Sequence, residues 1–257
     1  MRWSELTSQE FASLDRDLPV VMNLAATEQH GPHLPLASDA LIGLHFLEEV
    51  NKLHDKGVLI TPQIEVCCSA HHMDFYGTLT VRHETFLHYV CDIIDSIHAH
   101  GFRNIVLFNS HGGNEAIGRV ILEKWGSANP DASIFMLTWW SVVSEELRAI
   151  QESDFGGVGH ACEFETSLLM HFAPHMVRDG NFEFSPPPST FEWAEADMLN
   201  PPCGNFYRSM KEISGGTGVA GAPQYASSEK GARISKLVST QLVKMLKDIR
   251  QKNDAIA

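Results

Sequence analysis

The chain has 257 residues, 44% of them hydrophobic, and a formal net charge of −13. This length and apolar content are enough for one α/β domain over residues 1–257. The acidic balance, without a basic stripe of interleaved aromatics, argues against nucleic acid and anionic membranes as partners. No run approaches the roughly 18 apolar residues of a membrane span, and no signal-peptide core follows the first residues, so we expect a cytoplasmic protein.

Short apolar runs alternate with helical patterns along the first 140 residues. The apolar runs cover 20–24, 58–60, 105–108 and 134–137, and the helical patterns cover 39–56, 84–100 and 115–126. Further helices are expected near 168–170 and, from apolar residues at helical spacing, over 234–249. Strands and helices alternating in this way predict a mostly parallel sheet flanked by helices on both faces.

The pattern breaks down over residues 180–223. This region contains three consecutive prolines at 186–188, a proline pair at 201–202 and scattered aromatics. An irregular segment of this length inside a compact domain predicts a functional loop, a lid or a subunit contact.

The most informative polar cluster follows the first apolar run. In extended backbone Glu28 and His30 point to the same side, and Pro32 and Pro35 stiffen a loop that lets Asp39 return toward them. Carboxylates combined with imidazole suit Zn, Mn or Fe, whereas Ca and Mg prefer oxygen ligands alone. The sequence therefore predicts part of a metal site here; the alternative is a polar loop with solvated side chains.

A second polar cluster, residues 109–114, follows the run 105–108. Parallel sheets place ligand sites outside the carboxyl ends of their strands, so His111 is expected to project into the same site. Glycines 112 and 113 permit a close backbone approach, and Asn114 can begin the next helix. Alternatively, His111 is a turn residue bonded to backbone.

Two further clusters complete the candidate site. His160, Glu163 and Glu165 precede an apolar helix and can supply a further ligand and a proton carrier. The alternative makes both glutamates first-turn acids that favour the helix dipole. The loop 69–80 contains His72, which we predict to contact substrate, and no metal ligand is assigned to this loop.

Together these clusters resemble the creatininase (creatinine amidohydrolase) family. The resemblance runs from about residue 18 to the last helix and rests on four ordered motifs: Glu28-x-His30-Gly31-x-His33-Leu34-Pro35-Leu36-x-x-Asp39, Asn109-x-His111-Gly112-Gly113-Asn114, His160-x-x-Glu163-x-Glu165-Thr166-Ser167, and Gly218-Val219-x-Gly221-x-Pro223 with Ala226 and Glu229-Lys230-Gly231. It implies a compact α/β hydrolase of cyclic or linear amides, with two divalent metals and often a hexameric assembly.

The resemblance implies that Glu28, Asp39 and His111 hold one metal. It also implies that His30 and Asp39 hold a second one, with Asp39 bridging, and that His160 is catalytic.

The chain departs from creatininase at Gly113, where creatininase has a glutamate ligand. This departure argues against creatinine as the substrate and makes Glu163 the natural replacement ligand. Glu165 is a candidate catalytic residue that orients an imidazole. Trp140 aligns with a substrate-contacting tryptophan, and a buried core tryptophan is the alternative reading.

The predicted function is metal-dependent hydrolysis of an amide C–N bond by attack of metal-bound hydroxide. Zinc is the first choice of metal, with Mn or Fe as alternatives, and the predicted partners are a small-molecule amide or lactam and further copies of the chain. Because Lys and Arg are scarce near the motifs, a phosphorylated substrate is less favoured, although Arg82 or Arg119 could contact phosphate.

Three alternatives stay open at this point. The first is a formamide deformylase acting on a pyrimidine-type substrate, and the second is a non-catalytic, metal-stabilised binding or scaffold protein. The third is a dinucleotide oxidoreductase, because residues 216–221 match G-x-G-x-x-G. That match follows no apolar strand and runs into Pro223, so it lacks the strand–turn–helix context of a phosphate site.

Overall fold

The protein is built around one parallel sheet. In a computed structural model, residues 1–178, 180 and 191–256 are described. The strands are β1 (Val20–Leu24), β2 (Leu59–Ile60), β3 (Asn104–Asn109) and β4 (Ser133–Thr138), in the order β2-β1-β3-β4. All pairings are parallel. The predicted parallel α/β fold is confirmed, and the predicted run 20–24 coincides with β1.

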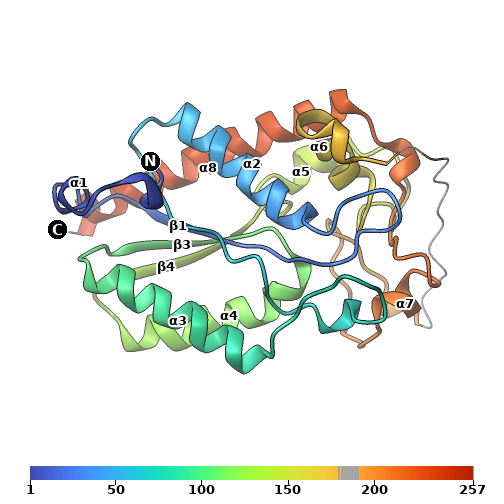
Figure 1. Ribbon diagram of the computed structural model, residues 1–257, viewed down its shortest axis with the longest axis horizontal. Helices are drawn as coiled ribbons and strands as arrows, with labels where there is room; N and C mark the ends of the chain where they lie inside the picture. The colour runs from blue at the N-terminus through green and yellow to red at the C-terminus, as the bar shows by residue number, and fades with distance from the viewer. Residues whose placement is uncertain (179, 181–190, 257) are drawn as a thin grey trace.

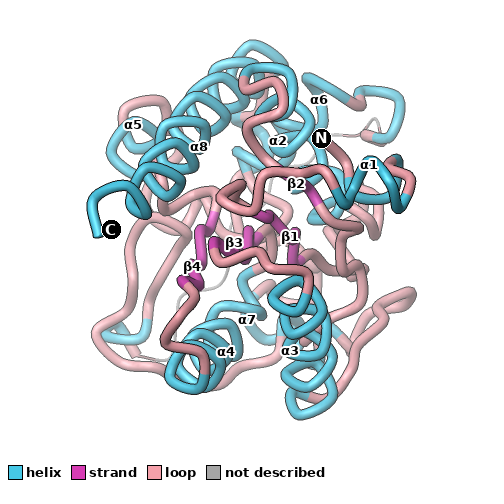
Figure 2. Tube along the Cα trace, turned by 90° about the vertical axis from the view of Figure 1, so that its left-hand side faces the viewer, coloured by secondary structure: helices cyan, strands magenta, loops and turns pink. Residues whose placement is uncertain are grey.

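Helices cover both faces of the sheet, as Figures 1 and 2 show. α2 (Ser38–Leu53) and α8 (Ser228–Ile256) lie on one face, and α3 (His83–Ala99) and α4 (Glu115–Ala128) on the other. The alternation of side chains along each strand produces two cores. Val21 and Phe108 pack in the core beneath α2 and α8, whereas Met22 and Leu107 pack in the core with α3 and α4.

The other helices are short, apart from α6, which packs against α2 and α8. The α-helices are α1 (Ser8–Ala12), α5 (Ser144–Arg148), α6 (Glu163–Phe172) and α7 (Met210–Ile213). The 3-10 helices are η1 (Trp3–Glu5), η2 (Ala70–His72), η3 (Gly112–Asn114), η4 (Pro174–Met176), η5 (Glu192–Ala194) and η6 (Pro223–Tyr225). No described helix is long and apolar enough to cross a membrane.

Part of the predicted irregular region 180–223 lies outside the described residues, including the prolines at 186–188. Over its described portion, 191–223, the secondary structure consists of η5, α7 and the first residue of η6. This part of the chain therefore has little periodic structure, as predicted from its composition. Its role as a lid or subunit contact, and the single-domain organisation over 1–257, stay predictions.

The strand order places a crevice at the carboxyl ends of β1 and β3. The chain leaves β1 toward α2 on one face, whereas it leaves the neighbouring β3 toward α4 on the opposite face. Adjacent parallel strands whose connections diverge in this way form a topological switch point, where open α/β sheets bind ligands. The two clusters around Glu28 and His111 follow these two strands.

Candidate metal centre

Three acidic or imidazole side chains meet at this crevice. Glu28 comes from the loop after β1, Asp39 from the first turn of α2, and His111 from the loop after β3. His111 Nδ1 lies 3.2 Å from Glu28 Oε1 and 3.1 Å from Asp39 Oδ2. All three side chains are buried.

A second group shares Asp39. His30 Nε2 lies 3.2 Å from Asp39 Oδ1 and 3.9 Å from Glu165 Oε1. The two oxygens of Asp39 therefore face two different imidazoles. Ligand atoms of Glu28, His30 and Asp39, and separately of His30, His160 and Glu165, lie within 4.8 Å of one another, close enough to hold a metal ion.

Buried carboxylate oxygens without hydrogen bonds indicate that this cluster is built for a cation. Both Glu28 oxygens and Asp39 Oδ2 are buried, and no described residue meets them in hydrogen-bond geometry. The ring nitrogens of His72 and His111 nevertheless lie 3.1–3.2 Å from Glu28 Oε1 and Asp39 Oδ2. A buried carboxylate without compensation costs several kcal/mol. A divalent ion held by these carboxylates and imidazoles would remove that cost, and the mixed O and N donors fit Zn, Mn or Fe.

The shifted pKa values of the cluster residues also indicate a site for a cation. Burial lowers the pKa of His30, but Asp39 and Glu165 outweigh it and raise that pKa to about 9. Burial raises the pKa of Glu165 to about 7. Burial also acts to raise the pKa of Asp39, but the positive charges of His30 and His111 hold it well below its usual range. In the absence of a metal, protons compensate the buried negative charge instead.

The loop before α6 aims His160 at the cluster. His160 pairs with Ala220 through two backbone hydrogen bonds of 2.7 and 2.9 Å. Ala161 has a φ of 52°, in the left-handed region that L-residues rarely adopt. This sharp turn joins the His160 bridge directly to the start of α6 at Glu163.

The hydrogen bonds of His160 define which ring nitrogen faces the cluster. His160 Nε2 lies 2.7 Å from the backbone oxygen of Gln29. The side-chain amide nitrogen of Gln29 also lies 3.1 Å from Nε2. Because a carbonyl only accepts and its contact is the shorter one, we assign the proton to Nε2, which leaves Nδ1 bare. Nδ1 lies 3.7 Å from Glu28 Oε1. Burial and the positive charge of His30 lower the pKa of His160 well below its usual range, so the ring is neutral.

His72 contacts Glu28 from another side of the cluster. Gln29 Oε1 accepts the backbone N–H of Gly31, so its amide nitrogen donates to His72 Nδ1 at 3.0 Å. The proton of the neutral His72 ring is then on Nε2, 3.2 Å from Glu28 Oε1. His72 also lines the cavity above the centre. Its predicted substrate contact stays a prediction, and its observed contact positions Glu28.

The structure does not bring Glu163 to the cluster. Its carboxylate accepts the backbone N–H groups of Glu152 (2.9 Å) and Ser153 (3.0 Å) and forms a buried ion pair with Lys230. Glu163 and Glu165 both lie in the first turn of α6, and positions two apart on a helix differ by about 200° in direction. The structure therefore corrects the predicted placement: Glu165, not Glu163, faces the candidate ligands His30 and Asp39.

We expect Lys230→Met to lower the free energy of unfolding by about 3–5 kcal/mol, because Glu163 would stay buried without its counter-charge. The Lys230 side chain is 3% exposed, so solvent cannot substitute for it. Urea unfolding measures the loss. The double variant Lys230→Met/Glu163→Gln is the matched control, because it removes both charges. A double variant as unstable as Lys230→Met would contradict this account of the pair.

This chain has a glycine at position 113, where creatininase has a glutamate ligand, and close packing accounts for the difference. A Cβ at this position would collide with the carbonyl oxygen of Cys68 and with the ring of His111. Since the colliding oxygen belongs to the backbone, a side chain at 113 requires a shift of the chain. Position 113 therefore cannot supply a ligand in this arrangement, whereas Glu165 of α6 places a carboxylate oxygen 3.9 Å from His30 Nε2.

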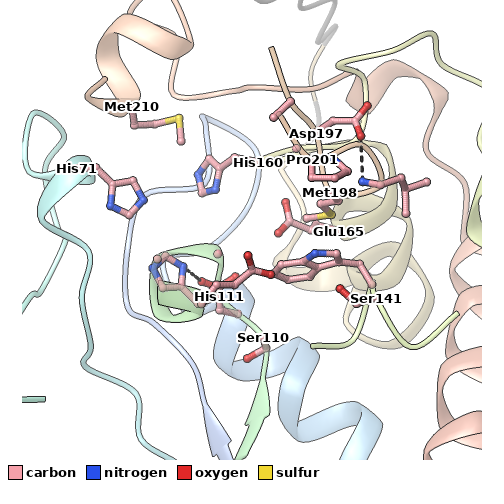
Figure 3. A pocket seen from close by; sticks show the side chains of 18 of the residues that line it. His71, Ser110, His111, Ser141, His160, Glu165, Asp197, Met198, Pro201 and Met210 are labelled. Carbon is pink, nitrogen blue, oxygen red and sulfur yellow. Dashed lines mark hydrogen bonds and ion pairs between the residues drawn. The ribbon is translucent and has the colours of Figure 1, made fainter. Parts of the chain in front are cut away.

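A cavity of about 560 Å³ opens above the cluster. Both predicted substrate contacts, Trp140 and His72, line it, together with Arg119. Figure 3 shows side chains from separate segments around this space, among them His71, His111, His160 and Glu165. Sequence reasoning missed His71, which groups with Glu28 and His111; its only signal was its place beside His72 in the loop 69–80.

The residues 216–221 do not form a dinucleotide-binding turn. The element before them is the short helix α7, and no strand precedes them within the described portion of this region. Gly218 has a φ of 76°, and a Cβ there would collide with the side chain of Gln29. Gly218 therefore serves close packing against the loop that contains Glu28 and His30, whereas Gly221 packs against Cys162 and Gly157.

Comparisons with known proteins find relatives over most of the chain. The family model Creatininase, described as creatinine amidohydrolase, matches residues 4–246. The mycofactocin precursor peptide peptidase of Mycobacterium tuberculosis is 30% identical over 239 residues, which cover 90% of this chain and 85% of that protein. For its Mycobacterium ulcerans counterpart, also 30% identical, the match covers 60% of that protein. The 3-dehydro-scyllo-inosose hydrolase of Thermotoga maritima is 24% identical over 91% of this chain and 78% of that protein.

A solved structure of creatinine amidohydrolase has the same fold, with a TM-score of 0.76 at 22% identity over 96% of each chain. Related creatininase structures are described as a Zn-Zn type and as a Mn form. The predicted resemblance is thus confirmed over nearly the whole chain, at a distance from creatininase itself. This chain belongs to the creatininase family, whose members are metal-dependent amidohydrolases acting on carbon–nitrogen bonds.

Proposed function

We propose that this protein hydrolyses a C–N bond of a small-molecule amide at a centre of two divalent ions. Glu28, Asp39 and His111 would hold one ion, and His30, Asp39 and Glu165 would hold the other, so that both would share Asp39. The observation that supports it most is the set of buried Glu28 and Asp39 oxygens beneath the cavity, which face imidazole nitrogens. Zinc is the first choice, and Mn or Fe are alternatives.

The ions and His160 have different roles in the proposed reaction. When bound, two ions that share a carboxylate lower the pKa of a water and polarise a carbonyl. His160 holds a bare Nδ1 toward the cluster and accepts the proton of the attacking water. The same nitrogen then delivers that proton to the leaving amine. Its depressed pKa favours this delivery, because the protonated ring readily releases its proton.

The walls of the cavity orient the substrate. Trp140 is 6% exposed, packs edge-on against Trp139 and lines the cavity. Its fixed ring offers a flat apolar surface against which an amide plane can pack. Gln29 holds both His72 and the backbone of the loop in place, so the loop keeps one geometry during turnover.

Metal analysis paired with a hydrolysis screen tests this function. We expect elemental analysis of gently purified protein to find about two divalent ions per chain. We also expect chelation to abolish hydrolysis and to lower the thermal unfolding temperature, because an ion that binds only the folded state stabilises it. Restored activity on adding Zn or Mn is the control. Protein without metal that also gains nothing from added metal would contradict the proposal.

The substrates in the screen follow from the family and the cavity. Creatinine, other cyclic amides and formamides represent the lactamase and deformylase alternatives. Short peptides are included because the peptidase of Mycobacterium tuberculosis matches 90% of this chain. Metal retention without turnover on any of them would favour the scaffold alternative. The cytoplasmic location and the homo-oligomer, a hexamer by resemblance, stay predictions.

A further inference from the structure

A second cavity, of about 520 Å³, lies beside the first. Four residues line both cavities, so the two spaces are contiguous: His71, Gly113, Ala196 and Pro202. The remaining wall comes from the loop before η2, the start of α3, and the irregular segment that leads to α7. A ligand over the metal centre can therefore extend past His71 into the second cavity.

The second cavity differs from the first in charge. Five of the residues that line the first cavity are Asp or Glu, whereas the residues that line the second include none. Arg208 and His83 line the second cavity instead. In a chain with 32 acidic and 19 basic residues, a cavity without a carboxylate favours an anion.

Arg208 is available for a ligand. Its side chain makes no hydrogen bond or ion pair within the described part of the chain, and the residue is half-buried. Other arginines are already engaged in ion pairs, for example Arg103 with Asp131 and Arg250 with Asp15. Beside Arg208, Phe206 and Tyr207 add aromatic surface to the cavity wall.

We propose that the second cavity is an anion subsite, in which Arg208 binds a carboxylate or phosphate carried by the amide substrate. The proposal rests on the proposed function, because it places the scissile amide above the metal centre and the anion beyond His71. The planar guanidinium matches a carboxylate or phosphate through paired N–H donors. His83 adds a further donor, and the aromatic wall contacts the apolar part next to the anion.

Paired ligands test the subsite on the metal-loaded protein. The first series is N-acetylated glycine, diglycine and triglycine, each with a free carboxylate or a carboxamide at its end. The second series is N-acetylaminoalkyl phosphates and the corresponding neutral alcohols. Isothermal titration calorimetry gives the dissociation constants. At the length that spans both cavities, we expect the anion to bind about tenfold or more tightly than its neutral partner.

Variants of arginine locate the source of that preference. Arg208→Met is expected to remove most of the preference for the anion. Arg208→Lys is expected to retain part of it, because lysine keeps the charge but lacks the paired N–H donors of the guanidinium. The control is Arg233→Met, an exposed arginine on α8 that lines neither cavity. Thermal unfolding confirms that each variant is folded. The series that shows the larger Arg208-dependent preference distinguishes carboxylate from phosphate.

Two results would overturn the subsite: equal affinity for anion and neutral partner at every length, or a preference that survives in Arg208→Met. The second result would mean that the anion binds the metal ions directly. Since hydrolysis is measured separately in the substrate screen, failure of the proposed function is distinguishable from failure of the subsite. Arg208-dependent binding without any hydrolysis would contradict the enzyme and retain the subsite.

Discussion

Replacing Asp39 by Asn is expected to lower kcat/KM by at least about 10³-fold, since losing one preorganised electrostatic group alone costs about 10²–10³ in other enzymes. Asp39 lies between His30 and His111, with one oxygen 3.2 Å from the first and the other 3.1 Å from the second. An amide keeps the shape but loses the negative charge that both ions would share. We therefore expect the metal content to fall for both sites together.

Elemental analysis and steady-state kinetics on the same preparation measure this prediction. Asp92→Asn is the matched control, because Asp92 is exposed on α3 and lines neither cavity. The control is expected to keep two ions and full activity. An Asp39→Asn protein that retains both ions would show that Asp39 does not bridge them.

His160→Gln is expected to give the opposite combination, with metal retained and kcat reduced by about 10²–10⁴-fold, the usual contribution of a general acid or base. Glutamine can replace the hydrogen bond from His160 Nε2 to the backbone of Gln29. It cannot take up and release a proton at the position of Nδ1. Metal binding by Glu28, Asp39 and His111 does not require it.

The comparison with Asp39→Asn makes this prediction specific. His160 also belongs to a possible ligand group with His30 and Glu165. If His160→Gln lost one ion and kept the other, His160 would be a ligand and not a proton carrier. A variant with full turnover would remove His160 from the mechanism altogether.

Much of the fold could be predicted because the central strands β1 and β3 are buried on both faces. β1 and β3 read as continuous apolar runs, and the polar residues that follow them mark the carboxyl edge of the sheet. The positions of Glu28 and His30 on one side of the chain follow from extended spacing alone. The sequence therefore predicts this half of the cluster, and the structure brings Asp39 and His111 to it.

The acid from α6 could not be predicted from spacing, because the sequence left open whether Glu163 and Glu165 precede that helix or form its first turn. With extended backbone, Glu163 and Glu165 would both point to one side. α6 begins at Glu163, so the two acids point in nearly opposite directions. Lys230, 67 residues further along the chain, then neutralises the acid that faces away from the site.

The second cavity lay beyond sequence reasoning for a different reason. Arg208 belongs to a region without regular periodicity, so no pattern indicated which way it would face. The scarcity of Lys and Arg near the motifs argued against an anionic substrate. The fold instead supplies a cation from outside the motifs, at the far side of His71 from the metal centre.

Anomalous diffraction from crystals of the zinc-loaded protein would test the dinuclear centre most directly. We expect two peaks about 3.5–4 Å apart. One should lie within ligand distance of Glu28 and His111, the other within that distance of His30 and Glu165, with Asp39 between them. A single peak, or a peak bound by Glu163, would contradict the proposed centre.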